Sequence, residues 1–143
     1  MSKAYRIGKR ESAAFAVTAL VAILLTASAF IMAHQPEVVE VRMQLNVADY
    51  TGFNLDTDAL YFGAISPGGS GTRDLNMVND RSGPRKVSVF LEGELAGWVQ
   101  PSEGSFVIDG GGSKAVTFKV SVPPSAVTGE YSGTIRLVFT DIS

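Results

Sequence analysis

Cysteine is absent from the 143-residue sequence. The chain therefore has no disulfide bond, no thiolate zinc site and no cysteine nucleophile. Histidine occurs once, at His34, where a long apolar segment ends. A Ser-His-Asp triad in the rest of the chain would need a base within hydrogen-bond reach of its nucleophile, and His34 is poorly placed for that role. We therefore expect a non-enzymatic protein without catalytic residues, whose fold depends on its apolar core.

Basic residues are scarce after residue 35, where eight face thirteen acidic ones. A nucleic-acid-binding domain needs a basic face to neutralise phosphates, so we expect no nucleic-acid partner. Among the acids, Asp56 and Asp58 lie two apart and could share a calcium ion with loop carbonyls. No spaced run of oxygen ligands accompanies them, so solvated turn residues are the favoured interpretation. We expect neither a metal nor a cofactor.

A long uncharged run is present near the N-terminus, from Ser12 to Ala33. As a helix its 22 residues would span roughly 33 Å, close to the hydrocarbon thickness of a bilayer. Four basic residues precede the run and acids follow it, which predicts a cytoplasmic N-terminus. The sequence thus predicts a cytoplasmic basic segment (1–11), a single transmembrane signal anchor (12–33) and an extracytoplasmic domain (37–143) in the cell membrane.

Two other interpretations of this run stay open. A cleaved signal peptide would use Ala27–Ala29 as its small-residue cleavage site, although Phe30, Ile31 and Met32 continue the apolar run beyond it. A prepilin leader would be removed after Gly8, but Glu11 is not where typical pilins carry their glutamate. All three interpretations place the domain outside the cytoplasm.

Beyond Pro36 apolar and polar residues alternate, which predicts strands with one buried face. The clearest alternations run over 39–47, 116–122 and 131–140, and shorter strands are expected at 59–65, 73–79, 86–92, around Trp98 and at 105–108. Turns rich in glycine and proline separate them. This pattern predicts an all-β fold, an immunoglobulin-like β-sandwich of seven to eight strands, preceded by one transmembrane helix.

The stretch Pro67–Thr72, "PGGSGT", looks like a phosphate-binding loop. Such a loop needs a lysine after its last glycine and a helix whose first amides face the phosphates. Here Arg73 begins a strand-like alternation instead. We therefore expect a strand connection in which glycine supplies positive φ angles.

Several motifs carry a resemblance to a known family over most of 58–140. They are Phe62-Gly63 before Pro67-Gly68, Arg73 leading Leu-x-x-x-Asn, Gly-x-x-x-x-Val after a glycine-rich turn, and the closing Gly-x-Tyr-x-Gly-x-Ile. This region resembles the immunoglobulin-like domains that include Hydin-like and alpha-galactosidase-associated modules. The resemblance implies a non-catalytic module of a bacterial or archaeal surface protein, used in adhesion, filaments or carbohydrate association. The single anchor and short chain also resemble small archaeal surface-filament components.

Three aromatic residues are candidates for contact with a partner. Phe90, with Val138, falls on the polar face of its strand, and Tyr61 lies in a short strand that could be an edge. Trp98 is either a core residue or a platform for stacking a sugar ring. The leading hypothesis is protein–protein contact in a cell-surface complex or filament. The alternatives are binding of carbohydrate or another envelope polymer, with Trp98 and Tyr61 stacking on it, and a pilin-like filament subunit. Tyr131 is expected to hydrogen-bond the backbone at a strand corner.

Overall fold

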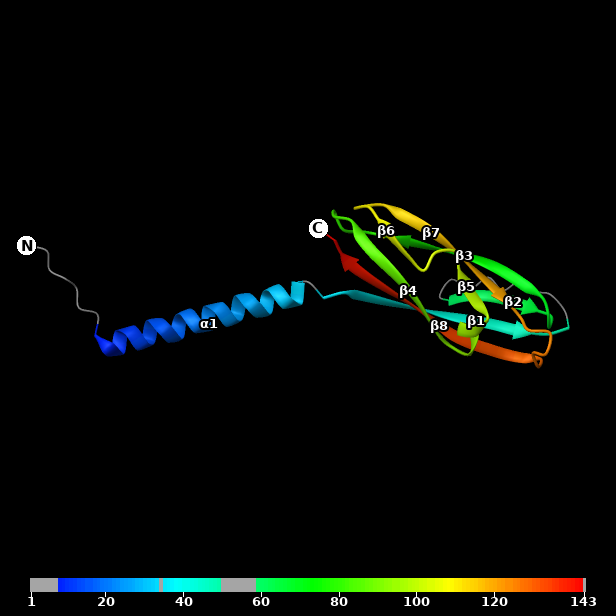
Figure 1. Cartoon of the computed structure of the whole chain (residues 1–143), viewed down its shortest axis with the longest axis horizontal. Coiled ribbons are helices and arrows are strands. Elements are labelled where there is room, and N and C mark those ends of the chain that lie inside the picture. The colour runs from blue at the N-terminus through cyan, green and yellow to red at the C-terminus, as the bar shows by residue number, and fades with distance from the viewer. Residues whose placement is uncertain (1–7, 34, 50–58, 143) are drawn as a thin grey trace, which may run out of the picture. The chain divides into compact units, whose positions relative to one another are not determined.

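The computed structural model describes residues 8–33, 35–49 and 59–142 (Figure 1). The chain divides into a helical unit, Met1–Gln35, and a β unit, Pro36–Ser143. Three residues discussed above, His34, Asp56 and Asp58, lie outside the described residues. The interpretation of Asp56 and Asp58 as solvated turn residues and the end of the membrane span at His34 therefore stay predictions.

The helical unit consists of α1, Lys9–Ala33. Its first turn is capped reciprocally, because the Glu11 amide donates to the Gly8 carbonyl and the Glu11 side chain accepts from the Gly8 amide. Inside the helix the hydroxyls of Thr18 and Thr26 donate to the carbonyls of Ala14 and Ala22, at 2.9 and 3.0 Å. Such internal bonds satisfy polar groups that would otherwise face hydrocarbon. The helix is long and apolar enough to cross a membrane, as an anchor or as a signal sequence.

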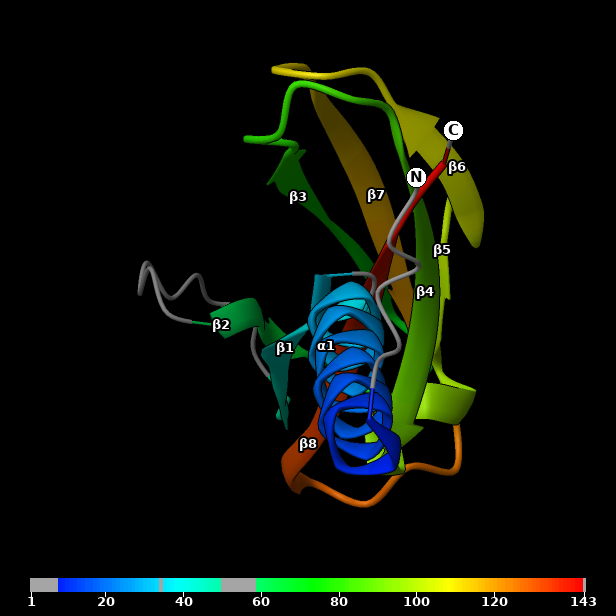
Figure 2. The same cartoon turned by 90° about the vertical axis from the view of Figure 1, so that its left-hand side faces the viewer.

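Within the described residues, the β unit has eight strands in two sheets. The larger sheet has the order β2-β1-β8-β4-β6 and is a curled half-barrel; the smaller has the order β3-β7-β5. Figure 2 shows the larger sheet curving around the side on which β3 and β7 lie. The strands are β1 (Glu37–Val47), β2 (Ala59–Ile65), β3 (Ser70–Val78), β4 (Arg85–Gly93), β5 (Val99–Pro101), β6 (Ser105–Ile108), β7 (Ser113–Ser121) and β8 (Gly129–Asp141).

Most predicted strands are confirmed, and those at 59–65 and 105–108 have the expected bounds. β3 begins three residues earlier than predicted, at Ser70, because Ser70–Thr72 pair with Lys119–Ser121 of β7. The strand expected around Trp98 is wrong at Trp98 itself. A short 3-10 helix, Glu94–Gly97, precedes this residue and β5 follows it.

The glycine-rich stretch is a turn between β2 and β3, as expected. The Gly69 amide donates to the Ser66 carbonyl at 2.9 Å, and Gly68 has a φ of 81°. Proline at the second position and a glycine with positive φ at the third are the signature of a type II turn. The interpretation of this loop as a strand connection is confirmed.

The first strand of the β unit lies inside the larger sheet. β1 pairs antiparallel with β8 along its whole length, from Glu37 opposite Phe139 to Val47 opposite Gly129. On its other edge β1 pairs in parallel with β2, but only over Arg42–Val47. The first and last strands of the β unit, β1 and β8, therefore lie side by side.

The core fills the space between the two sheets. β7 contributes Val116, Phe118 and Val120, and β1 contributes Met43, Leu45 and Val47, all of them buried. Inward residues alternate with outward ones along both strands, which is the pattern that the sequence predicts for one buried face.

Gly133 of β8 marks a close approach between elements. A Cβ atom there would lie 2.7 Å from the Glu92 carbonyl oxygen and 2.9 Å from the Met43 Cε atom. We expect Gly133→Ala to lower the free energy of unfolding by about 1–3 kcal/mol, because the surrounding backbone must shift. Trp98 is the single tryptophan, so urea unfolding followed by its fluorescence measures the change. Gly97→Ala is the control, since a Cβ atom there meets nothing within 4 Å; equal losses at both positions would refute the packing argument.

Candidate contact surface

The outer face of the larger sheet carries a small apolar patch. Phe90 of β4 has half of its side chain exposed (50%), and so does Val38 of β1. Val138 of β8 lies directly opposite Val38 and directly opposite Ser88. Phe90 is therefore the diagonal cross-strand neighbour of Val138, within reach of an aromatic side chain. We call Phe90, Val138 and Val38 the outer patch.

Charged residues border the outer patch. Arg136 lies opposite both Phe90 and Glu40 in the sheet, and its guanidinium forms an ion pair with Glu92. An apolar centre with a charged rim is the usual anatomy of a protein contact surface. The sequence predicts exposure of Phe90 and Val138, whereas Val38 was not among the predicted contact residues. The signal was the adjacent pair Val38-Val39, because a strand with one buried face can turn only one of two neighbours inward.

The other two candidate residues lie apart from the outer patch. Tyr61 is half-buried in β2 and opposite Gln44 of β1. Phe90 lies level with Glu40 of β1, because both are opposite Arg136 of β8. Glu40 and Gln44 are four residues apart in β1, so Tyr61 and Phe90 are separated by about 13 Å along the strand direction. Trp98 is half-buried and packs against the core, with its ring centroid 4.6 Å from that of Tyr131. The three aromatic residues therefore do not form one surface, and Trp98 lies where a core residue would.

Tyr131 occupies the strand corner that the sequence predicts. Its hydroxyl donates to the Val127 carbonyl at 2.8 Å, which ties the start of β8 to the segment before it. The ring packs on Trp98 at the same time. The structural interpretation of Tyr131 is confirmed.

A groove of about 320 Å³ opens where the first half of β1 faces the end of β3. Among the described strands, none pairs with Glu37–Val41 on the β2 side, so the sandwich is open there. We call this opening the side groove. Its apolar walls are formed by Val39, Val41, Leu75, Met77, Val78, Leu137 and Phe139, and its polar walls by Glu37, Asn76, Asp80 and Arg85.

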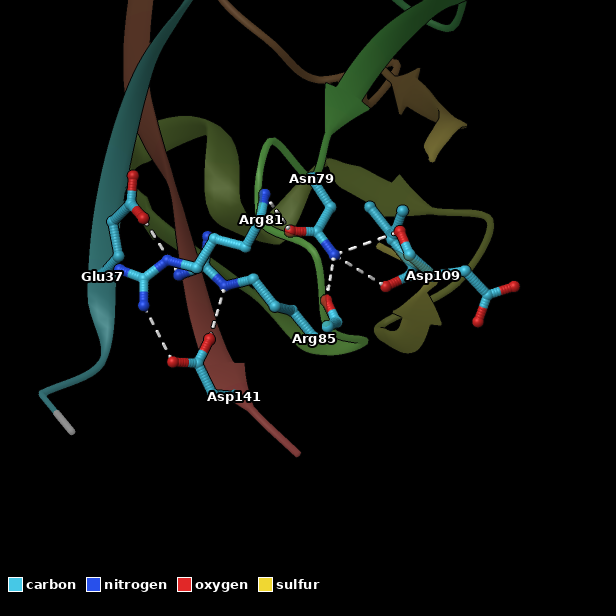
Figure 3. Close-up of polar contacts among 8 residues, drawn as sticks. Glu37, Asn79, Arg81, Arg85, Asp109 and Asp141 are labelled. Carbon is cyan, nitrogen blue, oxygen red and sulfur yellow. Dashed lines mark hydrogen bonds and ion pairs between the residues drawn. The ribbon is translucent and has the colours of Figure 1, made fainter. Parts of the chain in front are cut away.

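A buried cation lies at one end of the side groove (Figure 3). Arg85 is only 3% exposed. Its Nη2 atom lies 2.9 Å from a Glu37 carboxylate oxygen, and its Nε atom lies 3.1 Å from an Asp141 carboxylate oxygen. The guanidinium carbon also lies 4.8 Å from the centre of the Phe139 ring. Arg85 thus links the first residue of β1 to the last residue of β8.

Asn79 forms a second polar centre nearby, also drawn in Figure 3. Its side chain is completely buried. The amide nitrogen donates to the carbonyls of Gly83, Ile108 and Asp109 at 2.9–3.1 Å, and the amide oxygen accepts from the Arg81 amide at 3.2 Å. This pattern satisfies backbone carbonyls from two loops, so Asn79 holds the loops together.

The acidic side chains of the described residues do not gather into a metal centre. Within residues 8–33, 35–49 and 59–142, no three His, Cys, Asp or Glu residues gather closely enough to hold an ion. Several carboxylates are paired instead, such as Glu103 with Lys114 at 2.8 Å and Asp74 with the Thr117 hydroxyl at 2.6 Å.

Comparisons of the chain with protein-family models, with curated proteins and with solved structures gave no match. What can be concluded about function therefore comes from the geometry: an apolar helix, a β domain of two sheets, and an outer patch with a charged rim.

Proposed function

We propose that this chain is a non-catalytic, membrane-anchored protein whose extracytoplasmic domain works through protein–protein contacts in a surface complex or filament. The observation that carries the proposal is the outer patch, where Phe90 and Val38 are each half exposed on a rigid sheet. Contiguous exposed apolar side chains with a polar rim are typical of interaction sites. The helix α1, preceded by basic residues, supplies the anchor and the orientation.

We further propose that the β unit is immunoglobulin-like. The sheet β3-β7-β5 corresponds to strands B, E and D of that fold, and β4-β8-β1 corresponds to C, F and G. The bond from Tyr131 to Val127 supports this assignment, since a tyrosine at the start of strand F makes such a bond. Two features depart from the common pattern: β6 pairs with β4 although it follows β5 in the chain, and β1, the first strand, fills the place of strand G.

Binding of carbohydrate receives less support from the geometry. A stacking platform needs an open aromatic face, whereas the Trp98 ring packs on Tyr131 and against the core. Tyr61 is half-buried and on a different part of the sheet from Phe90. The outer patch, by contrast, has the exposed apolar centre and the charged rim of a protein contact surface.

Photo-crosslinking in intact membranes tests the proposed function. We expect p-benzoylphenylalanine in place of Phe90 in the full chain to give a discrete product of higher mass that contains a second polypeptide. The control replaces Lys119, which is exposed on β7 in the other sheet, and should give no such product. Absence of a product at position 90, or the same product at both positions, would contradict the proposal.

The same membranes test the anchor by the mass of the uncrosslinked chain. An uncleaved anchor leaves the full 15.1 kDa chain in the membrane fraction. A chain that has lost the segment up to Ala29 would identify this segment as a cleaved signal peptide instead of an anchor. Loss of the segment up to Gly8, together with high-order polymers, would identify a pilin-like subunit.

A further inference from the structure

We propose that β1 is exchanged between copies, so that Glu37–Val47 of one chain fills the place between β8 and β2 in a second copy. The inference rests on the proposed membrane-anchored contact function and names one partner for it, a second copy of this chain. Exchange of an identical element between protomers is a general route to assembly, and strand addition to a sheet is one of its forms.

The first argument is how weakly the chain connectivity holds β1 in place. β1 pairs with β8 over its whole length, yet residues 48–128 separate the two strands in sequence. Residues 48–58 separate β1 from its other neighbour, β2, so neither neighbour directly follows β1 in sequence. Its first half also has a free edge on the β2 side, among the described strands, and lies along the open side groove. β1 can therefore separate sideways while the β3-β7-β5 sheet stays intact.

The second argument is the connection between β1 and β2. The two strands are parallel and adjacent, so the chain must return from Val47 to Ala59, which pairs with Arg42. That return covers about 16 Å along the strand. Parallel neighbours usually need a crossover of about a dozen residues or more, and here eleven, 48–58, are present. When β1 is donated to another copy, residues 48–58 no longer have to run back along their own strand. Fully extended, these residues reach about 36 Å, which is comparable with the diameter of a domain of this size.

The third argument is that exchange preserves every contact of the strand. Met43, Leu45 and Val47 enter the same core, and Glu37 meets the same buried Arg85 of the accepting copy. Whether a chain keeps its own β1 or accepts β1 of a second copy then depends on the length of the β1–β2 connection and on the local concentration of copies. Membrane anchoring through α1 confines the copies to one surface and raises that concentration.

Paired cysteines test the exchange without background, because the native chain has none. Glu40 and Arg136 lie directly opposite in β1 and β8, and opposed residues of antiparallel strands have Cα separations that a disulfide can bridge. Glu40→Cys and Arg136→Cys are placed on two full-length chains with different tags and co-produced in one membrane. Exchange predicts a disulfide-linked heterodimer that disappears on reduction.

Two controls define the result. Asp74→Cys and Thr117→Cys on separate chains should stay unlinked, since these residues are opposed within the β3-β7 pair, which exchange does not involve. Glu40→Cys with Arg136→Cys on one chain shows that the disulfide forms in this geometry. Val41→Cys with Ile135→Cys repeats the test one residue along the same register, at positions that pack in the core. A contact between outer faces could link Glu40→Cys to Arg136→Cys without exchange, whereas only exchange brings Val41→Cys of one chain beside Ile135→Cys of another.

A heterodimer no more abundant than in the Asp74 and Thr117 control, with the single-chain pair linked inside monomers, would overturn the exchange. Such a result would leave the proposed contact function intact if Phe90 still crosslinks to another polypeptide. Conversely, a clear heterodimer with no product at position 90 would support exchange and remove the outer patch from the contact.

Discussion

Replacing Phe118 by alanine should lower the free energy of unfolding by about 3–5 kcal/mol, the range for deleting a buried aromatic ring from a core. Phe118 lies in β7, the central strand of the smaller sheet, and its side chain is completely buried between the sheets. Small domains have about 5–15 kcal/mol of stability in total. The substitution therefore removes a large share of it.

The loss of stability can be measured by urea unfolding, with Trp98 fluorescence as the probe. Lys119→Ala is the matched control, because Lys119 is the next residue in β7 and faces solvent; its effect should stay within about 0.5 kcal/mol. A loss below about 1.5 kcal/mol at Phe118 would mean that the two sheets pack less closely there than the buried side chain indicates.

Replacing Asn79 by alanine should lower the free energy of unfolding by about 2–4 kcal/mol. The change leaves the carbonyls of Gly83, Ile108 and Asp109 without their shared donor and deprives the Arg81 amide of its acceptor. Each buried polar group left without a partner costs about 1–3 kcal/mol, reduced where water or another donor enters. Thermal or urea unfolding measures the sum.

Asn79→Asp separates the role of the donor from that of side-chain volume. A carboxylate has nearly the same shape but directs negative oxygens at three carbonyl oxygens, so it should destabilise the domain at neutral pH more than alanine does. Asn76→Ala is the control, since Asn76 is exposed on β3 and should change stability by less than about 0.5 kcal/mol. If Asp and Ala were equally tolerated at position 79, the loops would be held by something other than this amide.

The individual strands follow closely from local sequence. Strands β1, β7 and β8 all bury alternate residues, because successive side chains of an extended chain point to opposite faces. The prediction was wrong at Trp98, where Glu94–Gly97 wind into a 3-10 helix. Leu95, in that short helix, is completely buried, and a Cβ atom on Gly133 would lie 3.3 Å from its Cβ atom. The short helix therefore packs against β8, a strand remote in sequence, and local alternation does not predict that packing.

Only part of the candidate contact surface could be predicted from the sequence. Phe90 and Val138 stood out because they break the alternation of their strands. Val38 joins them only because β1 lies beside β8, with Val38 opposite Val138. Arg85, by contrast, begins a strand like any exposed basic residue, and its burial depends on Glu37 and Asp141 arriving from the two ends of the β unit.

Four features follow from the sequence alone: the long apolar helix, the all-β character of a domain with seven to eight strands, the turn at Ser66–Gly69 and the exclusion of thiol chemistry. Each of these depends on the spacing of residue types along the chain. The tertiary structure alone decided that β1 lies between β2 and β8, that the side groove opens beside it, and that the three candidate aromatics lie apart. Alternation specifies which face of a strand is buried, but a strand's neighbours are chosen by backbone hydrogen bonds and by a core assembled from distant parts of the chain.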